Sequence, residues 1–279
     1  LVKGASHGEG LGNKFLSHIR EVDAIVHVVR CFEDANITHV ENSVDPVRDI
    51  QTINLELILS DMETVQTRMS KVKNNAKGGA DKKAAEEYEF LEKIYAFLEK
   101  ENPARNFIVE EKDEEFYRNL FLLTSKPVIY AANIKETDMG KDEDSLPYAV
   151  RVKEFAKAEG SETLVICAKT EEELSQMEAE DKALFMEEFG LGESGLDRLI
   201  KKSYSLLGLI SYLTAGEKET RAWTITKGTK APQAAGKIHS DFERGFIRAD
   251  VVNWETLVSL GSLVAAKEKG KVRSEGKEY

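Results

Sequence analysis

The chain has 279 residues, of which 41% are hydrophobic and 32% are charged, and its formal net charge is −11. These fractions are typical of a folded globular protein and exclude a low-complexity or collagen-like chain. No run of about eighteen apolar residues occurs, so we expect no membrane-spanning helix and no membrane partner. Two cysteines far apart in the sequence, Cys31 and Cys167, indicate reduced thiols and a cytoplasmic location.

The first 44 residues predict a loop, a helix and a buried strand. Four glycines within Leu1–Gly12 make a loop that can approach a ligand closely. A helix is expected over Asn13–Arg20 and a strand over Asp23–Arg30. The loop that follows carries His39, which could position a water molecule or transfer a proton, although a single loop histidine is more often a surface residue.

The segment from Asp45 to about Glu101 predicts an antiparallel helical hairpin. Asp45 and Pro46 have the pattern of a helix cap followed by the first helical residue. Apolar residues then recur at spacings of three and four, which is typical of a coiled coil. They are Leu55, Ile58, Met62, Val65, Met69 and Val72 in the first helix and Ala84, Tyr88, Leu91, Tyr95 and Leu98 in the second. Five lysines near the tip could bind a phosphate backbone or simply be solvated; they are Lys71, Lys73, Lys77, Lys82 and Lys83.

Two further apolar strands each end in polar residues. A helix over Glu114–Thr124 leads to the strand that starts at Pro127 and ends at Asn133 and Glu136. After a helix over Ser145–Glu159, the strand Thr163–Ile166 ends in Cys167-Ala168-Lys169. Alternating strands and helices predict a parallel sheet, whose ligands bind at the carboxyl ends of the strands. The two strand-end loops could therefore line one crevice and read the edge of a purine, or be plain polar turns.

The pattern changes after Leu207, and a small α+β module is expected. Its predicted elements are strands over Ile210–Thr214 and Arg221–Ile225, a helix over Ala235–Glu243 and a strand over Phe246–Val252. Residues 217–279 carry 12 Lys and Arg against 9 Asp and Glu, whereas the rest of the chain is acidic, so this module is the better candidate for contact with RNA. Lys277-Glu278-Tyr279 has the pattern of the start of another strand, so we expect the module to be incomplete.

Taken together, these motifs resemble those of the YchF-type Obg-like ATPases, which are translation-factor class P-loop NTPases. The motif Asn133-Ile134-Lys135-Glu136 resembles the Asn-x-x-Glu that replaces the guanine-reading Asn-Lys-x-Asp, and Cys167-Ala168-Lys169 resembles the second base-contacting motif. Four other segments are similar to the family: Leu1–Gly12 to its glycine-rich switch segment, Asp45–Glu101 to its coiled-coil insertion, and Arg221–Ile225 and Ala231–His239 to its TGS domain.

The resemblance implies an α/β fold with a parallel-sheet, OBG-type P-loop NTPase domain over residues 1–205. Residues 45–101 would be an inserted antiparallel coiled-coil arm, and residues 206–279 a C-terminal α+β TGS domain, which is ubiquitin-like. In the family the P-loop and the first switch precede the position of Leu1, and no G-x-x-x-x-G-K-[ST] occurs in this sequence. The resemblance therefore implies a sheet that lacks its first strands, in a sequence truncated at both ends.

The resemblance also implies ligands and site residues. ATP would be the preferred nucleotide, with Mg²⁺ held by residues that precede Leu1 in the family, so no metal ligand is expected in this chain. The nucleotide-binding residues would be Asn133, Ile134, Glu136, Cys167, Ala168 and Lys169, and the switch loop would include Lys3, Gly4, Gly8, Gly10 and Gly12. Leu1 stands where many GTPases keep a catalytic glutamine, His39 is the family's candidate for positioning the water, and Cys31 matches a cysteine associated with redox control.

The function implied by the resemblance is hydrolysis of ATP by a monomeric protein that binds the ribosome at its large subunit, and possible RNA contact, in the regulation of translation or stress response. An alternative is a ribosome- or RNA-binding scaffold in which the nucleotide is only a conformational switch or is not bound. Nucleotide-independent binding to ribosomes would favour the scaffold. Because the 279-residue chain lacks a phosphate-binding loop, we expect this chain alone to be inactive as an ATPase.

Overall fold

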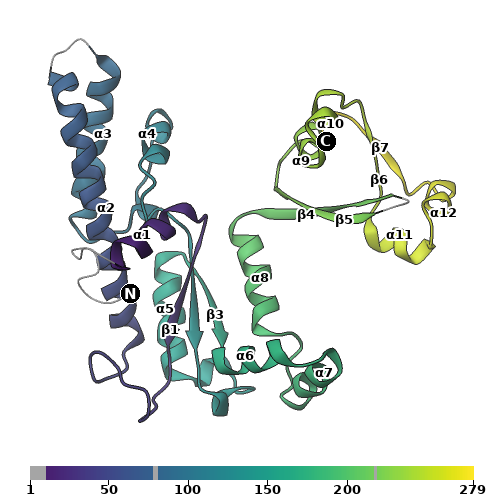
Figure 1. Cartoon of the computed structure of the whole chain (residues 1–279), viewed down its shortest axis with the longest axis horizontal. Coiled ribbons are helices and arrows are strands. Elements are labelled where there is room, and N and C mark those ends of the chain that lie inside the picture. The colour runs from purple at the N-terminus through teal and green to yellow at the C-terminus, as the bar shows by residue number, and fades with distance from the viewer. Residues whose placement is uncertain (1–10, 78–80, 217–218) are drawn as a thin grey trace. The chain divides into compact units, whose positions relative to one another are not determined.

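A computed structural model describes residues 11–77, 81–216 and 219–279 of the protein. The chain divides into two compact units, Leu1–Ser203 and Tyr204–Tyr279, and Figure 1 shows the helices and strands of each. Helices and strands alternate through the first unit, which confirms the predicted α/β class. No helix in the described part of the chain is long and apolar enough to cross a membrane.

A three-stranded parallel sheet lies at the centre of the first unit, as predicted. The strands β1 (Ile25–Arg30), β2 (Val128–Asn133) and β3 (Glu162–Ile166) are arranged in the order β1-β2-β3. The first five residues of β2 are buried because the strand has a neighbour on each side and is covered by packed side chains. Arg30 pairs with Asn133 and Asn133 with Ile166, so the three strands end side by side.

Helix α5 (Pro147–Glu159) packs on β2 and β3, and the first turns of α2 (Pro46–Lys77) pack on β1 and α5. Helix α5 begins with Pro147, whose missing N–H is not needed in the first turn, and ends at Gly160. Gly160 has φ of 73°, a left-handed conformation that glycine adopts without strain. The core beneath these helices consists of Val29, Cys31, Ile50, Val128, Tyr130, Ala132, Ile134, Leu146, Ala149, Val152, Ala156 and Cys167.

The predicted hairpin is formed by α2 and α3 (Lys82–Leu98), which pack side by side (Figure 1). With 32 residues at about 1.5 Å each, α2 is about 48 Å long. In α3 the apolar repeat is correct at Ala84, Leu91 and Leu98, which are buried, but it misses Phe90 and Ile94, which are buried as well. In α2 it is wrong at Leu55, which is exposed, whereas Leu57 is buried against helix α1 (Leu11–Glu21).

Asp61 of α2 fastens the base of the hairpin to the segment that leads into β2. Its carboxylate is fully buried and accepts hydrogen bonds from the N–H of Leu123 (2.7 Å) and from the N–H and hydroxyl of Thr124 (2.8 and 2.7 Å). Burial raises the pKa of Asp61, while these bonds and the charge of Arg20, 4.0 Å away, act in the opposite direction. Held in this way, the chain leaves helix α4 (Glu114–Asn119) early, so the predicted helix over Glu114–Thr124 is five residues too long.

The other helices of the first unit follow the sheet. They are α6 (Ala168–Gln176), α7 (Ala179–Glu188) and α8 (Gly195–Leu206), and the unit also has short 3-10 turns at Ala104–Asn106, Glu111–Asp113, Glu136–Asp138 and Glu143–Ser145.

The second unit has two antiparallel strand pairs, β4 (Leu209–Ala215) with β5 (Thr220–Thr226) and β6 (Ala249–Val251) with β7 (Arg273–Glu275). Its helices are α9 (Ala231–Ile238), α10 (Ser240–Arg244), α11 (Trp254–Leu260) and α12 (Leu263–Glu268). The predicted single helix Ala235–Glu243 is wrong because the backbone of His239 is extended, which separates α9 from α10. The last strand is Arg273–Glu275, not the predicted one starting at Lys277.

Candidate functional site

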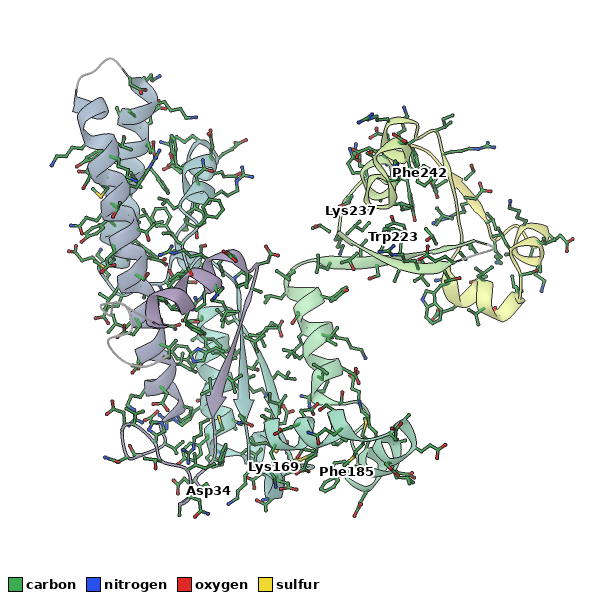
Figure 2. All side chains as sticks on the ribbon, in the orientation of Figure 1. Asp34, Lys169, Phe185, Trp223, Lys237 and Phe242 are labelled. Atoms are coloured by element: carbon green, nitrogen blue, oxygen red, sulfur yellow. The ribbon has the colours of Figure 1, made fainter. Side chains whose placement is uncertain are left out.

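The ends of β2 and β3 bring the predicted nucleotide-binding residues together. The N–H of Ala168 donates to Oδ1 of Asn133 (2.9 Å), and Nζ of Lys169 donates to Oε2 of Glu136 (2.6 Å). Figure 2 shows Lys169 at the carboxyl end of the sheet, the edge at which open α/β sheets bind ligands. Ala168 and Lys169 begin helix α6, so they are helical residues and not loop residues as the sequence predicts.

Some polar groups at this edge already have hydrogen-bond partners within the protein, and others do not. The hydrogen bond from Lys169 to Glu136, together with the negative charges of Glu136 and Glu173, raises the pKa of Lys169. One oxygen of Glu136 is therefore held by a cation, although both side chains are exposed. In the described part of the chain, the amide nitrogen Nδ2 of Asn133 has no hydrogen-bond acceptor, which leaves it able to donate to a ligand.

Two of the predicted base-binding residues have buried side chains. Ile134 is 7% exposed and Cys167 is 6% exposed, and both belong to the core of the sheet. The hydroxyl of Thr170 points at the sulfur of Cys167 at 3.3 Å. Any contact of Ile134 or Cys167 with a nucleotide base would therefore come from backbone atoms.

Cys31 follows β1 and is also buried. Its N–H donates to the carbonyl oxygen of Asn133 (2.8 Å), which extends the pairing of β1 with β2. Burial, and to a smaller degree the charge of Asp49, raises the pKa of the Cys31 thiol to about 12. Redox-sensing cysteines have lowered pKa values and exposed sulfur atoms, so this environment disfavours the predicted redox role.

We expect the Cys31 thiol to react slowly with disulfide reagents. With a pKa of about 12, roughly 10⁻⁴ of the thiol is ionised at pH 8, against roughly a quarter of a free cysteine with a pKa near 8.5. A Cys167→Ser variant, in which Cys31 is the one remaining cysteine, is expected to react more than 100-fold more slowly than free cysteine. Its rate should rise about tenfold per pH unit up to pH 10. A rate that levels off near pH 8 would contradict the raised pKa.

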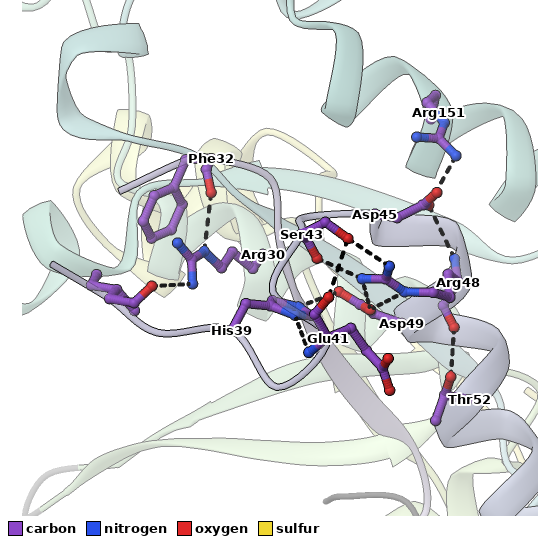
Figure 3. A network of polar contacts seen from close by, with 11 residues as sticks. Arg30, Phe32, His39, Glu41, Ser43, Asp45, Arg48, Asp49, Thr52 and Arg151 are labelled. Carbon is purple, nitrogen blue, oxygen red and sulfur yellow. Dashed lines mark hydrogen bonds and ion pairs between the residues drawn. The ribbon is translucent and has the colours of Figure 1, made fainter. Parts of the chain in front are cut away.

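His39 lies in the loop after β1, and both of its ring nitrogens are engaged (Figure 3). Its Nδ1 accepts a hydrogen bond from the N–H of Glu41 (3.1 Å), and its Nε2 lies 2.8 Å from Oδ2 of Asp49. An N–H donor on Nδ1 requires a lone pair there, so the proton of the neutral ring is on Nε2 and is donated to Asp49. Arg48 holds the other oxygen of Asp49 at 3.1 and 3.2 Å and also bonds to Ser43.

Several predicted residues fall elsewhere. Leu1, Lys3, Gly4, Gly8 and Gly10 lie outside the described residues, and Gly12 lies in the first turn of α1. At the hairpin tip, Lys82 pairs with Glu86 and Lys83 with Glu115, which shows that two of the five lysines are neutralised locally. No group of three or more His, Cys, Asp or Glu is placed to hold a metal ion within the described ranges.

Sequence reasoning did not find Asp49, Arg48 or Glu41. An acidic residue in the first turn of a helix is so common that it points to no partner, because it already suits the helix dipole. The contact of Asp49 with His39 depends on how the loop folds back over the start of α2, and no local pattern shows it.

Comparison with known proteins gives consistent matches along the chain. The family model YchF-GTPase_C, described as "Protein of unknown function (DUF933)", matches residues 209–279. The "Ribosome-binding ATPase YchF" of Bacillus subtilis (strain 168) is 56% identical over 279 residues, which are all of this chain and 76% of that protein. The protein of the same name from Escherichia coli O157:H7 is 47% identical with the same coverage.

A solved structure supports the same relationship at the level of the fold. The Schizosaccharomyces pombe YchF GTPase is 38% identical, with a TM-score of 0.84 over 98% of this chain and 73% of that one. Identity of this size over the whole chain, together with a shared fold, shows common ancestry. The chain belongs to the YchF family.

Proposed function

We propose that the protein binds ATP, with the adenine base held at the carboxyl ends of β2 and β3, and takes part in its hydrolysis. The names of the relatives support ATP as the nucleotide. The observation that carries the proposal is the state of the polar groups at this edge: Ala168 N–H and Glu136 are engaged, and the amide nitrogen of Asn133 is free to donate.

This arrangement suits adenine better than guanine. Guanine presents an O6 acceptor, which needs an N–H donor, and N–H groups, which need a free carboxylate. The N–H of Ala168 is already donated to Asn133, and Glu136 is paired with Lys169. The amide nitrogen of Asn133 can donate to N7, an acceptor that adenine and guanine share, so the choice between the bases comes from the groups that are already engaged. The described residues therefore fit the base of ATP, while they supply no cluster that would hold Mg²⁺.

We also propose that His39 positions the attacking water. A leucine in place of the usual glutamine, as at Leu1, cannot bond to water, and an imidazole can donate or accept a hydrogen bond near neutral pH. Asn133 would then bind the base, beside Ala168 and Lys169, and His39 would serve the reaction at the phosphate.

The hydrolysis proposal is tested with the chain joined behind the N-terminal P-loop segment of a family member, below termed the extended protein. We expect slow release of phosphate from ATP, and a fall of about 100-fold in kcat for His39→Ala with unchanged affinity for ATP. The 279-residue chain alone is expected to show no turnover. Equal turnover by the extended protein and its His39→Ala variant would refute the role of His39.

We propose the ribosome as the partner, because the relatives are named ribosome-binding. Contact at the large subunit, through RNA, would use the exposed Lys71 and Lys73 of the hairpin or the basic second unit. With it we propose that the protein is a cytoplasmic monomer that acts in translation or the stress response. We also propose that the helical hairpin is a coiled-coil arm and that the second unit has a TGS fold. Cosedimentation with ribosomes separates it from the scaffold alternative: affinity that changes with ATP supports a nucleotide-driven switch, and unchanged affinity supports the scaffold.

A further inference from the structure

His39 has no hydrogen-bonding capacity left in the structure. An imidazole ring has one hydrogen-bonding position at each nitrogen, in the plane of the ring. The position at Nδ1 is filled by the N–H of Glu41 (3.1 Å), and the position at Nε2 is filled by the carboxylate of Asp49 (2.8 Å). The His39 side chain is 18% exposed, and neither nitrogen can bond to a water molecule until one of these contacts breaks.

Asp49 is well placed to keep this contact. Arg48 binds its Oδ1 with two nitrogen atoms, which leaves Oδ2 directed at His39. The same guanidinium bonds to the hydroxyl and carbonyl oxygens of Ser43, at 2.9 and 2.6 Å, and so holds the end of the loop against α2. Figure 3 shows these four side chains, His39, Asp49, Arg48 and Ser43, joined into one network, which we term the latch.

The latch joins the loop of His39 to the base of the helical hairpin. Asp49 lies in the first turn of α2, a helix of 32 residues that forms one side of the hairpin. A charged hydrogen bond of this kind is easily lost when the two groups separate by more than about an ångström, because its strength falls steeply with distance and angle. A small rotation at the start of α2 is therefore enough to free Nε2 of His39.

We propose that Asp49 is an autoinhibitory positioning residue, which holds His39 in a state that cannot bond to the attacking water. Movement at the base of the hairpin releases the histidine. The inference rests on the proposed function for its kinetic consequence, but the latch itself is a property of the 279-residue chain and can be tested without catalysis.

The kinetic test compares two aspartates at the start of α2 in the extended protein. Asp49→Ala is expected to raise basal kcat for ATP about tenfold, because it removes a hydrogen bond to a charged group. Asp49→Asn is expected to give a smaller increase. Asp45→Ala is the matched control, since Asp45 bonds to Arg151 and to the N–H of Arg48 but not to His39. It is expected to leave kcat unchanged.

If the gain in kcat caused by Asp49→Ala requires His39, it comes from release of the histidine and not from a general loosening of the loop. In the double variant Asp49→Ala/His39→Ala, kcat is expected to equal that of His39→Ala alone. A gain that survives without His39, or equal gains in the Asp49→Ala and Asp45→Ala variants, would overturn the inference.

The structural test uses the 279-residue chain labelled with ¹⁵N at its five histidines, with His39→Gln to assign the signals. We expect His39 to be protonated on Nε2 and not on Nδ1, with an Nε2 proton that is protected from exchange. That protection should be lost in Asp49→Ala and kept in Asp45→Ala. A proton on Nδ1, or equal protection in both variants, would overturn the latch. An intact latch in an extended protein that does not hydrolyse ATP would refute the proposed function and leave the latch standing.

Discussion

Replacement of Asp61 by alanine is expected to destabilise the first unit by about 3–5 kcal/mol. The variant leaves three buried donors without acceptors, namely the N–H of Leu123 and the N–H and hydroxyl of Thr124. It also removes the charge that faces Arg20 at 4.0 Å. Because Asp61 lies in α2 and its partners lead into β2, the loss would separate the hairpin from the sheet. Asp61→Asn is expected to cost less, since one oxygen remains.

The chain offers an internal control for this measurement. Both tryptophans, Trp223 and Trp254, lie in the second unit. Urea unfolding followed by tryptophan fluorescence therefore reports on the second unit, while far-ultraviolet circular dichroism is dominated by the helices of the first. We expect Asp61→Ala to lower the midpoint of the dichroism transition and to leave the fluorescence transition unchanged. Exposed Asp181→Ala should shift neither by more than about 0.5 kcal/mol. A dichroism midpoint equal to that of the unmodified chain would contradict the role of Asp61.

Asn133→Ala is expected to weaken binding of ATP to the extended protein by about 100-fold. The variant removes the donor proposed for N7 of adenine and leaves the N–H of Ala168 without its acceptor. Two such losses, at about 1–1.5 kcal/mol each, correspond to a change of this size. Isothermal titration calorimetry measures the affinity directly.

Asn133→Asp separates the two losses. Its carboxylate can still accept the hydrogen bond from Ala168, but it can no longer donate to the base. We expect it to bind ATP more weakly than the unmodified protein while the contact of the two loops survives. Unchanged ATP affinity in both variants would place the base elsewhere.

The sheet and the hairpin could be predicted because their signals are local. The apolar run after Pro127 is long enough only for a buried strand, and it forms β2. The repeat in α3 places Leu91 and Leu98 correctly, since both face α2. The same repeat fails at Leu55, where α2 passes from the hairpin to the sheet and α1 covers a different face. A change of packing partner within one helix leaves no mark on its periodicity.

The candidate site likewise has contacts that the sequence predicts and contacts that it does not. The meeting of Asn133 and Glu136 with Ala168 and Lys169 follows from parallel strands that end together, and the structure confirms that these loops are in contact. The contact between His39 and Asp49 joins residues only ten positions apart, yet it depends on a loop without regular structure. The environment of Cys31 is likewise set by burial, which the sequence does not reveal.

The most direct test of the account is the ratio of ATP to GTP affinity, measured by calorimetry on the extended protein with and without Lys169→Ala and Glu136→Asp. Lys169 holds one oxygen of Glu136, and the double variant offers a shorter, unpaired carboxylate that can accept from guanine. We predict a preference for ATP in the unmodified protein and a shift of about tenfold or more toward GTP in the double variant. Equal binding of the two nucleotides before substitution, or a ratio that does not respond to it, would contradict the claim that these strand ends read the base.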